Sequence, residues 1–214
     1  MSPPAATVTA RRRTGRHRTV VRRRRRALAS FIGIGALVLV IVLALPLFRR
    51  AVNDLTLPLS YSDVIRQQAA EKHLDPALIA AVIYAETKFD PRPSSAGAEG
   101  LMQILPQTAE FLARRSGATT FTVADLGTPQ VNIAYGSYYL RYLLDLYKGE
   151  EVPALAAYNG GTTNVDHWLV FERQQGRPLT VSEIPFPQTQ AYVAKVLDAQ
   201  KRYRQTYPSE LGYS

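Results

Sequence analysis

An uncharged, apolar segment near the N-terminus places the strongest constraint on how this chain can fold. Residues 27–48 form 22 consecutive positions without a charge and are rich in Leu, Ile, Val and Ala. As a helix with a rise of about 1.5 Å per residue, the segment would be roughly 33 Å long, which is enough to cross a bilayer. The sequence therefore predicts a single transmembrane anchor over residues 27–48.

The charges on the two sides of this segment predict its orientation. Ten Arg residues lie between Arg11 and Arg26, whereas only Arg49 and Arg50 follow the segment directly. The positive-inside rule then places the Arg-rich tail, residues 1–26, in the cytoplasm and the downstream chain outside it. A cleaved signal peptide is the alternative, with a weak cleavage site at 42–44, and both interpretations export the downstream domain. For the tail itself, contact with anionic lipid or a nucleic-acid-binding arm are the other hypotheses.

The composition of the downstream part argues against several classes of function. Twelve of the 26 Lys and Arg residues fall within residues 1–50, which contain no acid, so the remaining 14 stand against 17 Asp and Glu. A basic nucleic-acid-binding face is therefore not expected there. The chain has no Cys, and its three His residues are widely spaced, which disfavours thiolate chemistry and a histidine-built metal site. We expect neither a metal nor an organic cofactor.

Helix signals follow one another after a short linker at residues 49–59. The expected helices cover residues 62–73, 76–87, 106–116, 129–147, 153–159, 164–170 and 189–207. One face of the longest helix is expected to be buried, and it holds Ile133, Gly136, Leu140, Leu143, Leu144 and Tyr147. No segment shows sustained strand alternation. The sequence thus predicts a compact, mainly α domain over residues 60–207, with a tail at residues 208–214.

The expected helix over residues 76–87 carries a carboxylate among apolar side chains. Ile79, Val82 and Ile83 precede Glu86 by seven, four and three residues. This spacing is the apolar stripe of an amphipathic helix, and Glu86 occupies the position of the next core residue. We therefore expect the Glu86 side chain on the inward side of the last helical turn.

This placement predicts an unusual acid. Asp75 and Pro76 supply an N-cap and a first turn, and Pro91 stops any continuation, so Glu86 lies near the negative end of the helix. Burial and the helix end both raise the pKa of a carboxyl. A carboxylic acid that stays protonated near neutral pH is suited to general acid catalysis. The structural alternative is a glutamate that reaches solvent or pairs with Lys88 or an arginine.

Further sequence blocks follow Glu86 in a characteristic order. They are PRPSSAGA at 91–98, GLMQILP at 100–106, AAYNGG at 156–161, and IPFP at 184–187 followed by Tyr192 and Val193. In these blocks the chain resembles the catalytic domain of the soluble lytic transglycosylases, the goose-lysozyme-like branch of the lysozyme superfamily. The resemblance covers about residues 60–205, and its specificity comes from the order of the blocks.

The resemblance implies a lysozyme-like helical domain with a cleft, acting on peptidoglycan strands. Glu86 would protonate the glycosidic oxygen between N-acetylmuramic acid and N-acetylglucosamine, and would then take the proton of the C6 hydroxyl as that oxygen attacks C1. The product would carry a 1,6-anhydromuramyl end. This scheme needs one acid/base, unlike glycosidases that use two carboxylates. A hydrolytic muramidase on the same fold and a non-catalytic peptidoglycan-binding module are the alternatives.

The resemblance also implies substrate-binding roles for residues in the matching blocks. A structural role is the alternative for each: a turn for the serine, the core for the methionine and the tyrosines, and a solvated loop for the second glutamate. The candidates are Ser95, Met102, Gln103, Tyr158, Asn159, Tyr192 and, more weakly, Glu183.

The chain departs from the family pattern at three places. Thr87 stands where the family normally has Ser, which adds a methyl group beside the acid. The loop from Glu86 to Gly100 is one residue shorter than the common pattern, which makes the placement of Ser95 less certain than that of Glu86. The sequence Gln-Thr-Gln at 188–190 replaces the usual Glu-Thr-Arg, so an ion pair is not expected there.

Overall fold

The computed structural model describes residues 35, 38–45, 57–91, 94 and 96–213, and the chain divides into two units at residues 54 and 55. In the first unit, residues 38–45 are helical and most of their side chains are large, apolar and exposed. Within the described residues, no helix combines the length and the apolar character needed to cross a membrane. Most of the predicted anchor at 27–48 and the whole Arg-rich tail at 1–26 lie outside the described residues.

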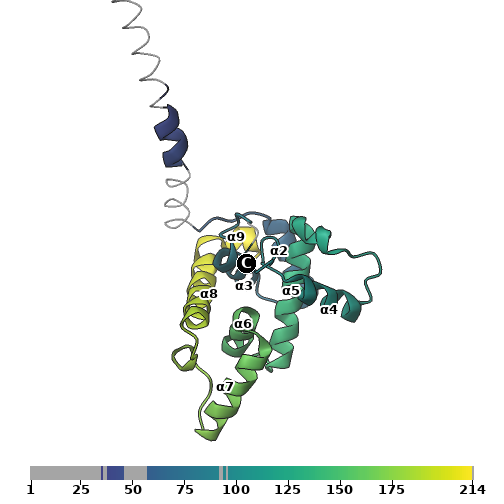
Figure 1. Ribbon diagram of the computed structural model, residues 1–214, viewed down its shortest axis with the longest axis vertical. Coiled ribbons are helices and arrows are strands. Elements are labelled where there is room, and N and C mark those ends of the chain that lie inside the picture. Colours follow the sequence, from purple (N-terminus) through teal and green to yellow (C-terminus); the bar gives the residue numbers. More distant parts are fainter. Residues whose placement is uncertain (1–34, 36–37, 46–56, 92–93, 95, 214) are drawn as a thin grey trace, which may run out of the picture. The chain divides into compact units, whose positions relative to one another are not determined.

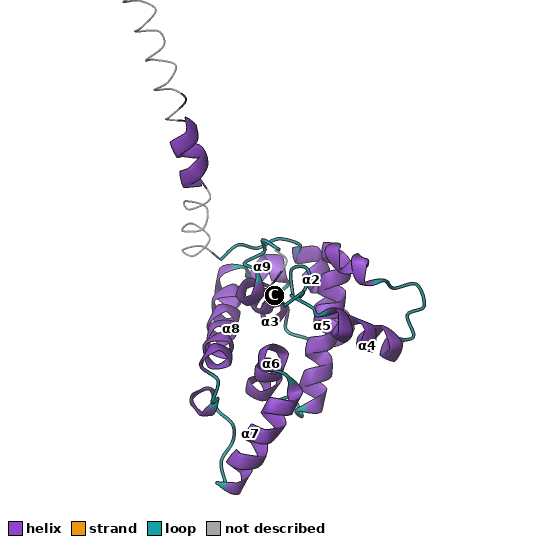
Figure 2. Cartoon of the chain, in the orientation of Figure 1, coloured by secondary structure: helices purple, strands orange, loops and turns teal. Residues whose placement is uncertain are grey.

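In the described part of the second unit the regular elements are helices, joined by loops and turns, as Figure 2 shows. Among these described residues, the only β-type pairing is one isolated antiparallel bridge between Glu99 and Ile104. The prediction of a mainly α domain is confirmed. In chain order the elements are α2 (Ser62–Lys72), α3 (Pro76–Glu86), α4 (Pro106–Ser116), the 3-10 helix η1 (Val123–Gly127), α5 (Pro129–Leu146), α6 (Glu151–Gly160), α7 (Thr162–Gln174), the 3-10 helix η2 (Val181–Glu183), α8 (Pro187–Thr206) and α9 (Pro208–Leu211).

Helix α3 lies inside the domain. The Asp75 side chain caps it by accepting a hydrogen bond from Ala77 N at 3.0 Å, and Pro76 occupies its first position. Every residue from Ala77 to Tyr84 is buried, so the helix is covered on all sides rather than along one stripe. The sequence prediction of an amphipathic helix is wrong in this respect, because small alanines let neighbouring elements close over the face that was expected to meet solvent.

Helices α8, α6 and α5 pack next to one another, with α8 beside α3. Helix α8 packs against both α3 and α6, and α6 lies between α8 and α5 (Figure 1). The predicted inner face of α5 is confirmed, since its five expected residues and Tyr147, which directly follows the helix, are buried. Helix α7 is longer than the expected 164–170 segment at both ends. The segment between α7 and α8 contains the short helix η2.

Both ends of the described domain pack onto it. Leu211 is buried at the end of α9, so the expected tail at 208–214 contributes to the core. At the other end, Leu57 is buried, and its carbonyl oxygen accepts a hydrogen bond from the Tyr207 hydroxyl at 2.6 Å. The last residues of the expected linker at 49–59 therefore belong to the folded domain.

Candidate active site

Helix α3 ends at Glu86, whose carboxyl group is largely shielded from solvent. Burial raises the pKa of the Glu86 carboxyl from its usual 4.5 to about 7, while Tyr192 and the positive charge of Lys195 act in the opposite direction. The predicted rise is confirmed, and burial is its main cause. A group with this pKa exists in both protonation states near neutral pH, so it can donate a proton and take one back.

Helix α8 places Tyr192 beside this carboxyl. Burial and the charge of Glu86 raise the pKa of the Tyr192 phenol well above its usual range. The hydroxyl interacts with Glu86, yet within the described part of the chain it makes no hydrogen bond of standard geometry. The Tyr192 hydroxyl is therefore buried close to the Glu86 carboxyl without an aligned hydrogen bond.

Helix α6 contributes Tyr158 and Asn159. The Tyr158 hydroxyl donates a hydrogen bond to Met102 O at 2.9 Å, and burial together with the Glu86 charge raises its pKa well above the usual range. The Asn159 Oδ1 atom accepts a hydrogen bond from Thr189 Oγ1 at 2.9 Å. Both side chains are thereby held in fixed orientations, Tyr158 near Glu86 and Asn159 against the start of α8.

The turn that contains Met102 is built around a buried amide. Asn132, from α5, accepts a hydrogen bond from Met102 N at 2.8 Å and donates to Glu99 O at 2.9 Å and to Leu126 O at 3.1 Å. Gly100 closes the turn with a φ of +71°, where a Cβ atom would lie 2.1 Å from the Asn132 amide nitrogen. This position therefore requires glycine.

Thr87 joins the turn to the end of α3. Its Oγ1 atom donates a hydrogen bond to Leu101 O at 2.8 Å and lies 3.2 Å from Ile83 O. The hydroxyl that the sequence keeps at this position thus has a structural function: it fixes the Met102 turn relative to Glu86. Among the residues that the structure describes, no group of three or more Asp, Glu or His side chains could hold a metal ion.

Comparison with known proteins identifies the family. The sequence profile described as "Transglycosylase SLT domain" matches residues 63–178, more than half of the chain. The chain belongs to this family.

Individual relatives agree with this assignment. The chain is 33% identical over 153 residues to the "Soluble lytic murein transglycosylase" of Escherichia coli K12, covering 68% of this chain and 23% of that protein. It is 27% identical over 168 residues to the "Membrane-bound lytic murein transglycosylase C" of Edwardsiella ictaluri, covering 67% of this chain and 46% of that protein. The chain thus spans about a quarter of the length of the soluble relative and about half that of the membrane-bound one.

A solved structure supports the fold. An inactive Glu-to-Gln mutant of the lytic transglycosylase Slt from Pseudomonas aeruginosa superimposes with a TM-score of 0.64 and 32% sequence identity, covering 70% of this chain and 24% of that one. The SLT domain described here therefore has the lysozyme-like helical fold of the lytic transglycosylases, as the sequence predicted.

The SLT domain does not bring all of the predicted site residues to Glu86. Met102 is fully buried against Gly136, so its side chain belongs to the core in this structure. The Gln103 side chain is partly exposed and donates a hydrogen bond to Gly100 O at 2.9 Å. Ser95 lies outside the described residues.

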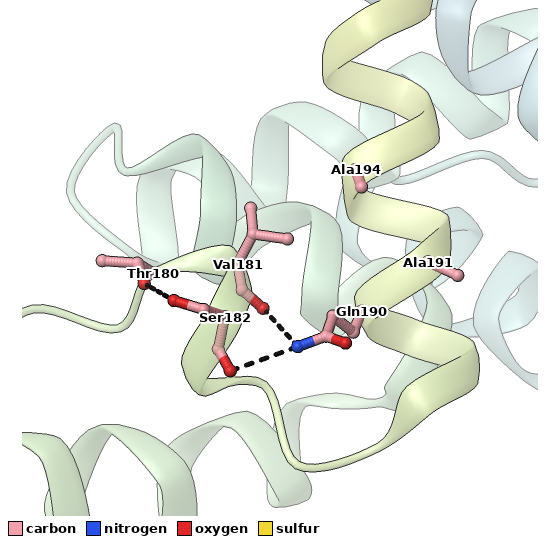
Figure 3. A pocket seen from close by; sticks show the side chains of 6 residues that line it. All are labelled: Thr180, Val181, Ser182, Gln190, Ala191 and Ala194. Carbon is pink, nitrogen blue, oxygen red and sulfur yellow. Dashed lines mark hydrogen bonds between the residues drawn. The ribbon is translucent and has the colours of Figure 1, made fainter.

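The predicted residue Glu183 lies in η2, beyond the residues 63–178 that match the SLT domain, next to a pocket between η2 and α8. Glu183 accepts a hydrogen bond from Ser182 Oγ at 3.0 Å. Gln190 Nε2 lies 3.1 Å from both Val181 O and Ser182 O, which holds η2 against α8 (Figure 3). The side-chain amide of Gln190 thus makes this connection. The pocket is lined by Thr180, Val181, Ser182, Gln190, Ala191 and Ala194.

Sequence reasoning missed three residues of the site. Asn132 holds the Met102 turn, and Thr189 orients Asn159. Lys195, on α8, donates a hydrogen bond to the last turn of α3. Lys195 could have been noticed, because it follows Tyr192 by three residues and therefore shares its side of α8. Asn132 had no comparable signal, since an asparagine in the first turn of a helix is common on the surface.

Proposed function

We propose that this chain is a lytic transglycosylase that cleaves peptidoglycan strands between N-acetylmuramic acid and N-acetylglucosamine. The observation that carries the proposal is Glu86, a shielded carboxyl at the end of a buried helix with a pKa raised to about 7. The names of the relatives, both murein transglycosylases, support the class of substrate. The Glu-to-Gln change in the inactive Pseudomonas aeruginosa mutant supports an essential glutamate.

The first step uses the protonated form of Glu86. Its carboxyl donates a proton to the glycosidic oxygen, the bond from C1 to that oxygen breaks, and the electron pair leaves with the oxygen. Positive charge develops at C1 of the muramic acid residue while Glu86 becomes a carboxylate. Burial favours the neutral form that this step requires.

The second step uses the carboxylate. Glu86 removes the proton of the C6 hydroxyl, whose oxygen forms a bond to C1 of the same sugar, so the product ends in a 1,6-anhydro ring. Glu86 regains its proton and no water is consumed. The neighbouring Tyr192 hydroxyl and Lys195 charge favour the carboxylate form. The same group can therefore serve both steps.

The substrate-binding residues follow from their positions around Glu86. We assign Tyr158, Asn159 and Tyr192 to the glycan beside the acid, and Gln103 to a sugar subsite through its partly exposed amide. For Met102 we assign only a structural role, since its side chain is fully buried. Ser95 and Glu183 stay candidates by family resemblance.

The products of the reaction test this function. Purified domain from residue 56 onward is incubated with peptidoglycan, and the products are analysed by mass spectrometry. We expect anhydromuramyl ends with the wild type, and a loss of at least about 10²-fold in rate with Glu86→Gln. Glu110→Gln, on the exposed face of α4, is the matched control and should leave the rate unchanged.

Other products would identify the alternatives. Reducing ends, heavier by one water, would assign the domain as a hydrolytic muramidase. Binding to peptidoglycan without cleavage by either variant would favour a non-catalytic wall-binding module and would contradict the proposed reaction.

We further propose that residues 27–48 anchor the chain in the cytoplasmic membrane, with residues 1–26 inside and the catalytic domain outside. The length of the apolar segment and the excess of arginine on its N-terminal side support this topology. A relative whose name describes it as membrane-bound is consistent with it.

A further inference from the structure

Lys195 reaches from α8 to the last turn of α3. Its Nζ atom donates a hydrogen bond to Ala85 O at 2.8 Å and lies 5.3 Å from the centre of the Tyr84 ring. Tyr84 and Ala85 are the two residues before Glu86. The last carbonyl groups of a helix lack partners within the helix and carry partial negative charge, so a lysine is stabilising at this position.

The charged and titratable groups that act on Glu86 or on Lys195 come from α6, from α8 and from the residues that follow α3. Tyr158 is on α6, Tyr192 and Lys195 are on α8, and Lys88 follows α3. Burial and the charge of Lys88 lower the pKa of Lys195, whereas the Glu86 carboxylate raises it. Lys195 and Glu86 therefore act on each other, although the hydrogen bond of Lys195 goes to the backbone one residue earlier.

We propose that Lys195 is a positioning residue for Glu86: it holds the last turn of α3 against α8 and sets a positive charge beside the carboxylate that forms when Glu86 gives up its proton. The proposal rests on the proposed function of Glu86 as acid and base. A carboxylate in a shielded site is costly without a nearby cation. A direct ion pair with Lys195 would keep Glu86 ionised, and Glu86 could not donate a proton. A cation hydrogen-bonded to the Ala85 carbonyl instead attracts the carboxylate without forming an ion pair with it.

Three variants of the domain from residue 56 onward separate the charge of Lys195 from its hydrogen bond. Lys195→Met removes both, Lys195→Gln keeps a donor for the Ala85 carbonyl, and Lys195→Arg keeps the charge. Lys201→Met is the matched control, because Lys201 is exposed on the same helix.

The first readout needs no substrate. The Glu86 carboxyl is titrated by ¹³C NMR in protein labelled at glutamate, and its signal is assigned by its absence in Glu86→Gln. We expect the titration midpoint to rise above that of the wild type in Lys195→Met and Lys195→Gln, and to stay close to it in Lys195→Arg and Lys201→Met. An unchanged midpoint in folded Lys195→Gln overturns the proposal, even where Lys195→Met does not fold.

The second readout is the pH dependence of kcat/KM for glycan cleavage. Because the first step needs protonated Glu86, the alkaline limb of the profile should move upward together with the NMR midpoint. A general loss of rate without a displaced limb would indicate a purely structural lysine and would contradict the proposal. If the wild type cleaves no glycan at any pH, the proposed function fails, whereas the NMR titration still decides whether Lys195 acts on Glu86.

Discussion

At the scale of single residues, the burial of the Glu86 carboxyl is expected to make the stability of the domain depend on pH. The pKa of this carboxyl is about 7 in the folded chain and 4.5 when unperturbed, with burial as the main cause. Below about pH 4.5 the group is neutral in both the folded and the unfolded states and has no effect on stability. Between pH 4.5 and 7 the unfolded chain releases the proton first, so folding becomes less favourable as the pH rises. Above pH 7 the penalty is constant.

Glu86→Gln is therefore expected to stabilise the domain in a pH-dependent way. At about 1.4 kcal/mol per pKa unit, the variant should exceed the wild type by up to about 3 kcal/mol in free energy of unfolding at pH 8, with little difference at pH 4. Urea denaturation of both proteins at the two pH values measures this difference. An equal stability at pH 8 would show that Glu86 is solvated rather than buried.

At the scale of secondary-structure elements, α5 supports the Met102 turn of the candidate active site. Gly136 lies on the buried face of α5, directly under the Met102 side chain, and Asn132 on the same helix holds the Met102 backbone. The Met102 carbonyl in turn receives the Tyr158 hydroxyl. The approach of α5 to this turn therefore influences the orientation of a tyrosine near Glu86.

Gly136→Ala tests this close approach. A Cβ atom at this position would lie 2.3 Å from Met102 Sδ and 2.7 Å from Met102 Cβ, so the turn would have to move. Glycine to alanine in a helix normally stabilises by about 0.5–1 kcal/mol. Here we expect destabilisation of about 1–3 kcal/mol from overpacking, together with reduced kcat, measured by thermal unfolding and by glycan cleavage.

The control for this prediction is Gly127→Ala. A Cβ atom there would have no other atom within 4 Å, so stability and activity should stay close to the wild type. If Gly136→Ala were as stable as Gly127→Ala, the contact between α5 and the Met102 turn would be looser than described.

At the scale of the whole molecule, charge separates the two parts of the chain. Residues 1–50 contain twelve Arg residues and no acid, whereas the residues after position 50 are mildly acidic. With this charge, the residues after position 50 are not expected to bind an anionic surface on their own. The proposed attachment to a membrane depends on the apolar segment at 27–48, which the arginine residues orient.

Fractionation of cells that express the full chain tests this attachment. We expect the protein in the membrane fraction, released by detergent and retained in 1 M salt, whereas the domain from residue 56 onward should be soluble. Release by salt alone would favour electrostatic contact of the Arg-rich tail with lipid, because salt screens such attraction. Loss of an N-terminal tag from the mature protein would instead indicate a cleaved signal peptide.

The sequence by itself determined the helical class, most helix positions, the inner face of α5 and the acid with a raised pKa. These follow from signals between near neighbours: apolar spacing, Asp75 and Pro76 at a helix start, and glycine after a helix end. The order of the sequence blocks also indicated the family, because this order can be read from the sequence without knowing how the helices pack.

Only the tertiary structure decided which side chains meet at the site. The burial of α3 on all sides, the core position of Met102, the amide of Asn132 at its backbone and Lys195 at the end of α3 all depend on packing between distant segments. Asn132 and Met102 are 30 residues apart, and Lys195 and Ala85 are 110 apart. Periodicity within one helix carries no information on such contacts, because they arise from how the faces of separate helices fit together in space.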